Sequence, residues 1–133
     1  DRFPGIKEYM NDTTAFAKAN DRVETLFGRV IHTPNINAKG PQAGFAKRAA
    51  INAPIQGTAA DIIRRAMIRM PDAIKDQPAK MLLQVHDELV FDMHNSESSE
   101  LKTLVKEKMV QAVSLQVPLI VDIGEGLNWL EAH

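Results

Sequence analysis

The residues best suited to chemistry stand together in the segment QVHDELVF, residues 84–91. His86, Asp87 and Glu88 separate two apolar runs that are each of strand length. Two such runs around a short polar stretch predict a β-hairpin, although this stretch has no Gly, Asn or Pro for its turn. Its three ionisable residues fit either a solvated charged turn or a metal or acid–base site that presents neighbouring carboxylates.

A second group of polar residues recurs at helical spacing. Arg48, Asn52 and Gln56 stand at i, i+4 and i+8, so they share a helix face if any kink at Pro54 is mild. Each carries hydrogen-bond donors, and most of the residues between them are small or apolar. The row is either a solvated polar face or a set of donors for a ligand. The DNA minor groove presents acceptors, purine N3 and pyrimidine O2, at every base pair.

Hydrophobic periodicity and turn residues predict the elements that position these two groups. Pro54 should break or kink the helix that carries the row. The expected elements are a helix over 3–21, a hairpin over 22–34, a loop over 35–44, a helix over 45–70, a connector over 71–80, the hairpin that bears His86, a helix over 96–115, a strand over 117–126 and a short tail. This order predicts an α+β fold with an antiparallel sheet and helices on one of its faces.

Composition and charge narrow the class of protein. The 133 residues suffice for one domain with a real core, and the 44% hydrophobic and 25% charged residues are ordinary for a globular chain. No cysteine is present, which excludes disulfides and thiolate metal sites, and a reducing cytoplasm fits. Residues 1–70 hold 11 Lys and Arg against 6 Asp and Glu, whereas residues 71–133 hold 5 against 11. This asymmetry suits one phosphate-facing and one cation-attracting surface, or reflects chance clustering.

The segment KRAAINAPIQGTAADIIRRAMI, residues 47–68, together with LLQVHDELVF, closely resembles the family A DNA polymerases of the bacterial DNA polymerase I type. VETLFGRVIHTPNI and the ending GLNW…AH match the same family, so the resemblance covers essentially the whole chain. It implies part of a right-hand fold: the end of the fingers with a hairpin over residues 1–45, and an antiparallel palm-type sheet with packed helices over residues 46–133. It also implies a bacterial, cytoplasmic and nucleoid-associated enzyme of replication and repair.

The family resemblance implies roles for both groups of polar residues. QVHDELVF corresponds to the family's motif C, which makes Asp87 a catalytic metal ligand and Glu88 its acidic neighbour, also expected at the metal. The expected cofactor is a pair of Mg²⁺ ions, which prefer such hard oxygen ligands. His86 should lie near the primer terminus, since histidine is a softer ligand than Mg²⁺ favours. The remaining set should contact the minor groove of primer–template DNA: Arg48, Asn52 and Gln56.

Two parts of the family's active site have no counterpart in this sequence. We find no second aspartate from an earlier palm strand and no Lys-x-x-x-[Phe/Tyr]-x-x-x-Tyr pattern, and Tyr9 is the only tyrosine. We therefore expect a C-terminal fragment of a polymerase that uses primer–template DNA and dNTPs. The isolated chain should be inactive, should bind Mg²⁺ poorly or not at all, and could self-associate through exposed apolar surface.

Two other kinds of function are consistent with the residues. The first is a non-catalytic duplex-binding module that uses only the row of donors. The second is a small metal-dependent hydrolase built on His86, Asp87 and Asp92. Divalent-metal titration with and without primer–template DNA separates these hypotheses, because a hydrolase should bind metal tightly without DNA.

Overall fold

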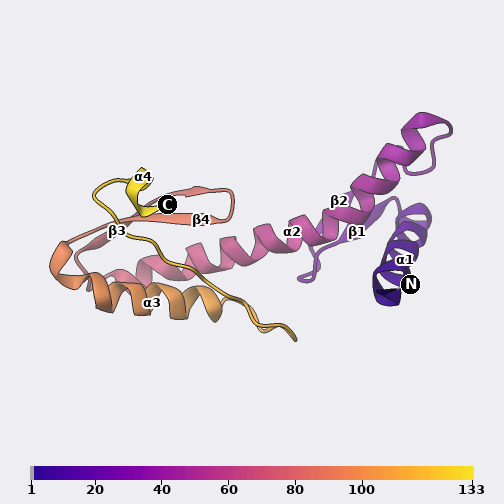
Figure 1. The fold of residues 1–133 in the computed structure, drawn as a ribbon. Helices are drawn as coiled ribbons and strands as arrows, with labels where there is room; N and C mark the ends of the chain where they lie inside the picture. The colour runs from indigo at the N-terminus through magenta and orange to yellow at the C-terminus, as the bar shows by residue number, and fades with distance from the viewer. Residues whose placement is uncertain (1) are drawn as a thin grey trace. The chain divides into compact units, whose positions relative to one another are not determined.

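The computed structural model describes residues 2–133, with only the backbone at Glu97. The elements in chain order are α1 (Pro4–Asn20), β1 (Arg22–Glu24), β2 (Val30–His32), α2 (Pro41–Ile74), β3 (Ala79–Val85), β4 (Glu88–Met93), the 3-10 helix η1 (Asn95–Glu97), α3 (Ser98–Val110) and α4 (Trp129–Ala132) (Figure 1). Helices combined with antiparallel strand pairs confirm the expected α+β class. None of the helices in this described range is long and apolar enough to cross a membrane.

The chain divides into two compact units, and the first extends to Asp61. Its helix α1 starts with a proline, whose fixed φ suits the first helical position, as predicted. The expected hairpin around Gly28 is also present, and β1 and β2 pair antiparallel. The core is formed by mostly small side chains from α1, β1, the loop between β2 and α2, and α2 itself: Ala17, Val23, Ile36, Ala46 and Ala50.

Helix α2 differs from its prediction at Pro54 and at both ends. Of the expected break or kink, the break is wrong, because one helix runs without interruption from Pro41 to Ile74. A proline inside a helix lacks the N–H that would bond to the carbonyl four residues earlier, here that of Ala50. The Tyr9 hydroxyl donates a hydrogen bond of 2.8 Å to the carbonyl of the next residue, Ile51. Packing of Ala50, which is 1% exposed, and this added hydrogen bond both stabilise the turn that the proline weakens.

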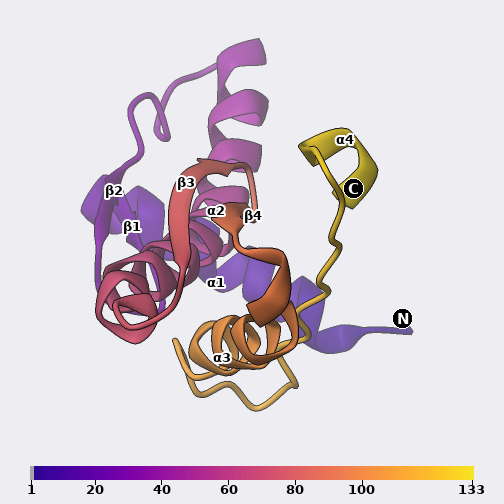
Figure 2. The same cartoon turned by 90° about the vertical axis from the view of Figure 1, so that its left-hand side faces the viewer.

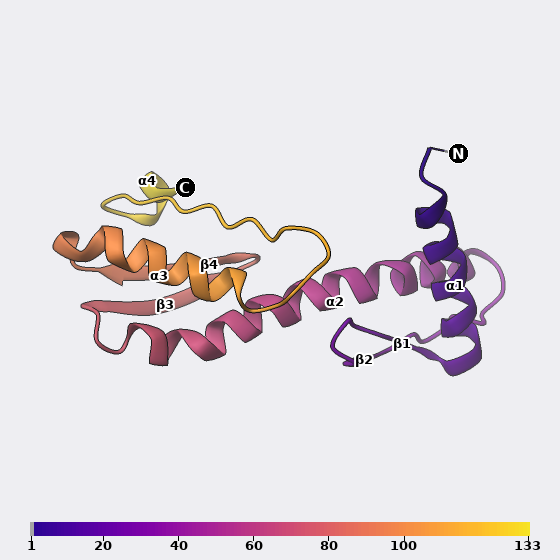
Figure 3. The same cartoon turned by 90° about the horizontal axis from the view of Figure 1, so that it is seen from below.

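The second unit, Ile62–His133, is built around the β3–β4 hairpin. The strands pair antiparallel from Ala79↔Met93 to Val85↔Glu88, with an irregularity between Met81 and Leu83. The end of α2 and helix α3 pack on this hairpin through four buried residues, which confirms helices on one sheet face (Figure 3). These residues are Met70, Ile74, Leu101 and Val105. Because Ile74 belongs to this core, α2 extends beyond the predicted end at residue 70.

The last part of the chain departs furthest from its prediction. Helix α3 ends at Val110, and residues 117–126 form an irregular segment instead of the expected strand (Figure 2). A strand requires a neighbour to accept and donate its backbone hydrogen bonds, and no strand in residues 2–133 pairs with this segment. Its apolar side chains are accordingly exposed, at 66% for Val117 and 76% for Ile120.

Candidate functional site

The acidic hairpin tip is a turn of two residues, His86 and Asp87, between β3 and β4. His86 has φ 52°, in the left-handed region that short hairpin turns use and that costs a residue with a β-carbon about 1–2 kcal/mol. The Gln84 side-chain amide donates a hydrogen bond of 2.6 Å to the His86 carbonyl. This bond supports a turn that contains no glycine. Glu88 was expected at the tip but is the first residue of β4, opposite Val85.

The two acidic residues differ in their surroundings. Asp87 is exposed on the turn, whereas the Glu88 side chain is 38% exposed. A Glu88 carboxylate oxygen, Oε1, lies 3.0 Å from Nδ1 of His133, the last residue of the second unit. Asp87 is therefore open to a ligand, and Glu88 already has a polar neighbour.

The distribution of acidic groups bears on the hypothesis of a metal-dependent hydrolase. Asp92 pairs in register with Lys80, four residues along β4 from Glu88, which is about 13 Å at the rise of an extended strand. Within residues 2–133 as described, no three His, Asp or Glu side chains come together in a group that could hold a metal ion. A hydrolase site built on His86, Asp87 and Asp92 therefore has no support from the geometry.

The row of donors lies on one uninterrupted helix. Arg48, Asn52 and Gln56 are all exposed on α2. At the α-helical rise and twist, each step of four residues advances about 6 Å and turns about 40°, so the row remains on one side of the helix. The helix continues through Pro54, so all three donors belong to one helix. Of the small residues between these donors, Ala50 packs into the core of the first unit.

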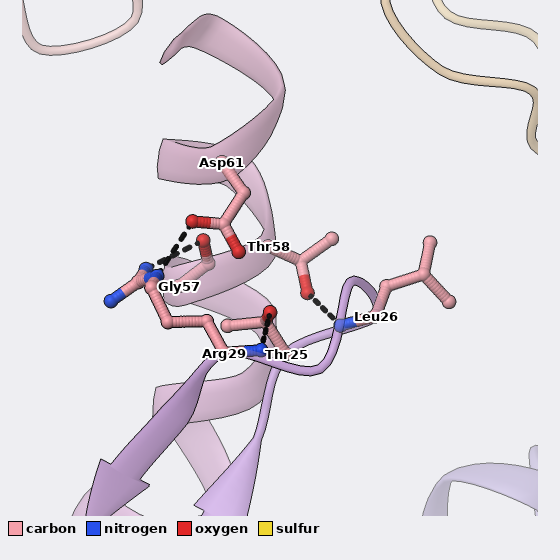
Figure 4. Close-up of polar contacts among 6 residues, drawn as sticks. All are labelled: Thr25, Leu26, Arg29, Gly57, Thr58 and Asp61. Carbon is pink, nitrogen blue, oxygen red and sulfur yellow. Dashed lines mark hydrogen bonds and ion pairs between the residues drawn. The ribbon is translucent and has the colours of Figure 1, made fainter. Parts of the chain in front are cut away.

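Sequence reasoning missed a contact between the β1–β2 turn and the part of α2 that belongs to the first unit (Figure 4). The Arg29 guanidinium bonds through Nε to Asp61 Oδ1 at 2.7 Å and through Nη2 to the Gly57 carbonyl at 3.1 Å. The Leu26 backbone N–H donates to Thr58 Oγ1 at 2.9 Å. In the sequence, Gly57 could have indicated this contact. A glycine inside a helix lowers its stability by about 1 kcal/mol relative to alanine, so its presence suggests close packing at that position.

The geometry thus places one exposed carboxylate, that of Asp87, on the hairpin turn and three exposed hydrogen-bond donors on α2. The family model for DNA polymerase family A matches residues 1–131, so the chain belongs to this family. The expected family and the expected partial polymerase fold are thereby confirmed.

Several similar proteins are each named DNA polymerase I. The one from Streptococcus pneumoniae serotype 4 is 50% identical over 99% of this chain, and the one from Pseudomonas aeruginosa is 44% identical over 99%. This chain spans 15% of the length of each of these relatives. A solved structure, the POL domain of Pol1 from M. smegmatis in complex with DNA primer-template and dNTP, has a TM-score of 0.93 and 44% identity to this chain. That match covers 99% of this chain and 24% of the solved one.

Proposed function

We propose that the polypeptide containing this chain is a template-directed DNA polymerase that adds deoxynucleotides to a primer 3′-end. The observation that carries this proposal is the family A match over residues 1–131. The complex of a similar structure with primer-template and dNTP supports the proposed partners. Relatives named DNA polymerase I in several bacteria support a role in replication and repair. We further propose that the polypeptide works in the bacterial cytoplasm, at the nucleoid. We also propose that residues 1–45 end the fingers and that residues 46–133 belong to the palm.

In this proposal Asp87 and Glu88 would hold Mg²⁺. Their oxygens fit this hard cation, which proteins commonly bind through one or two carboxylates and the phosphates of the substrate. Bound Mg²⁺ would stabilise the charge that develops as the primer 3′-oxygen attacks the nucleotide and the leaving oxygen departs. The exposed position of Asp87 supports its role as the principal ligand. Glu88 would contribute less, because His133 lies beside its carboxylate.

The other polar residues would position the DNA. His86 precedes the metal ligand on the same turn and would contact the primer terminus. The row on α2 would donate hydrogen bonds to purine N3 and pyrimidine O2, which occur at the same places in every correct pair. Readout of these common acceptors would let the enzyme extend any matched terminus without a base preference. The exposure of all three donors supports this role: Arg48, Asn52 and Gln56.

The acidic site is tested by Asp87→Ala in the full-length polypeptide. We expect single-turnover nucleotide addition to fall at least a hundredfold, since a metal contributes several kcal/mol to the transition state and about 1.4 kcal/mol equals tenfold. Primer–template affinity should change little. Glu88→Ala should have a milder effect, and Asp92→Ala, an exposed acid on the same hairpin, should retain normal activity. Near-normal turnover in Asp87→Ala would disprove the assignment.

The row of donors is tested by Arg48→Ala and Gln56→Ala. Each lost hydrogen bond should raise the transition-state free energy of extension by about 1–3 kcal/mol and so lower its rate. The reduction should be equal for all four terminal base pairs, because the acceptors are common to them. Gln42→Ala, an exposed glutamine on the same helix outside the row, is the matched control. A loss confined to one base pair would contradict minor-groove readout.

A further inference from the structure

The β1–β2 turn is fixed to a single turn of α2 by the groups shown in Figure 4. The turn closes on itself through hydrogen bonds from Thr25 N to Arg29 O, at 3.0 Å, and from Arg29 N to Thr25 Oγ1, at 3.2 Å. It then reaches α2 through the Arg29 guanidinium and the Leu26 amide. We call the contact of Arg29 with Gly57 and Asp61 the Arg29 latch.

The chemistry of the Arg29 latch is specific to arginine. Gly57 and Asp61 are four residues apart, so their acceptors lie one above the other on the same helix face. A planar guanidinium can bond to both at once, whereas a lysine ammonium is a point charge with no such fork. The Asp61 side chain is only 13% exposed, and a charge-assisted bond at 2.7 Å is stronger there than on an open surface.

The latch also depends on close approach of the turn to α2. Gly57 is buried, and a β-carbon at this position would lie 2.7 Å from Ile31 Cδ1 and 2.8 Å from Thr25 Cγ2. Real β-carbon contacts are not this short. The absence of a side chain therefore lets the hairpin seat directly on the helix backbone, with little room for sliding.

The Arg29 latch holds the helix turn that begins immediately after Gln56. Gln56 and Gly57 are neighbours in α2, so any rotation of the helix about its axis moves the Gln56 amide by the same angle. At the radius of about 5–6 Å at which helix side chains lie, a rotation of about 10° displaces such a group by about 1 Å. A displacement of about 1 Å at a positioning contact can reduce rate about a hundredfold.

We propose that Arg29 and Asp61 are positioning residues that hold the turn of α2 next to Gln56, and that they act on nucleotide addition through Gln56. Asn52 and Arg48 lie one and two turns earlier, where Ala46 and Ala50 pack in the core of the first unit. This inference rests on the proposed function, because it assigns a mechanical support to the same DNA contact. Arg29 itself touches neither DNA nor nucleotide in this scheme. Its substitution should therefore matter only while Gln56 is present.

The test is a double-mutant cycle in the full-length polypeptide with Arg29→Gln, Gln56→Ala and the combined variant. Single-nucleotide addition to a matched primer–template is followed in a single turnover. We expect Arg29→Gln to lower the maximal rate about tenfold to a hundredfold, with the half-saturating dNTP concentration within twofold of wild type. In the Gln56→Ala background the same substitution should lower the rate less than twofold further.

Two further variants make the result independent of folding. Asp61→Asn keeps the size of the side chain and removes its charge, so it should reproduce the coupling to Gln56 if Arg29→Gln does not fold. Arg22→Gln is the matched control, because Arg22 lies on the same hairpin and pairs along its own strand, with Glu24 at 3.4 Å. The control should retain the wild-type rate.

Each outcome decides between the two proposals. Equal losses from Arg29→Gln with and without Gln56 would overturn the inference, as would a normal rate in both Arg29→Gln and Asp61→Asn. If Gln56→Ala alone had no effect on any matched terminus, the proposed DNA contact of Gln56 would be disproved, and the inference that rests on it would fall with it. If Gln56→Ala impaired addition and the latch variants did not, only the latch would be wrong.

Discussion

Replacement of Gly57 by alanine gives a direct measure of how closely the β1–β2 turn approaches α2. The added β-carbon would meet Ile31 Cδ1 at 2.7 Å and Thr25 Cγ2 at 2.8 Å, so these side chains or the hairpin that carries them must shift. Overpacking of this kind costs about 1–3 kcal/mol. Alanine returns about 1 kcal/mol through its higher helix propensity. We expect a net loss of about 1 kcal/mol in the local stability of the turn on α2.

The assay is native-state hydrogen exchange of the full-length polypeptide, followed on a peptide that contains the amide of Leu26. This amide donates to Thr58 Oγ1 at 2.9 Å and becomes free to exchange when the turn leaves the helix. A loss of about 1 kcal/mol corresponds to about fivefold faster exchange, since 1.4 kcal/mol is a factor of ten. Exchange in peptides from β3 and β4 should be unchanged.

Gly44→Ala is the matched control on the same helix. A β-carbon there would find only Arg48 Nη1, at an ordinary contact distance of 3.6 Å. This substitution should therefore stabilise α2 by about 0.4–1 kcal/mol and slow exchange near residue 44. Unchanged or slower exchange at Leu26 in Gly57→Ala would refute the argument from close approach, whatever the control shows.

Three further outcomes are expected. Met70→Ala should lower the stability of the second unit by about 2–5 kcal/mol, because Met70 is 0% exposed. Ile68 is 68% exposed on the same helix, so Ile68→Ala should lower it by less than about 0.5 kcal/mol. Hydrogen exchange in peptides from β3 measures both losses. His86→Gly should stabilise the hairpin turn relative to His86→Ala by up to about 1–2 kcal/mol, because glycine adopts φ 52° without the strain that a β-carbon causes. Equal hydrogen-exchange rates for peptides of this turn in the two variants would contradict the prediction. The purified 133-residue chain should not extend a primer with Mg²⁺ and all four dNTPs, and light scattering should show its self-association; template-dependent extension would mean that it holds a complete site.

The sequence by itself determined the features that depend on neighbouring residues. Alternating apolar residues predicted the first hairpin, two apolar runs around a polar stretch predicted the second, and Pro4 marked the start of the first helix. The spacing of Arg48 and Gln56 predicted a shared helix face, since a period of 3.6 residues is a local property of the backbone. The resemblance of residues 47–68 and of QVHDELVF to the family A polymerases indicated the family, which the family match confirms.

Only the tertiary structure decided the features that depend on distant residues. Helix α2 continues through Pro54, next to the turn in which the Ile51 carbonyl accepts a hydrogen bond from the Tyr9 hydroxyl. Glu88 lies next to His133. Residues 117–126 have strand-like composition but form no strand, because the composition of a segment cannot supply the partner that a ladder needs. Gly57 weakens a helix by local preference, yet it is what lets the Arg29 turn reach the backbone of α2. At Pro54 and Gly57, contacts between residues far apart in sequence outweigh a local preference of about 1–3 kcal/mol.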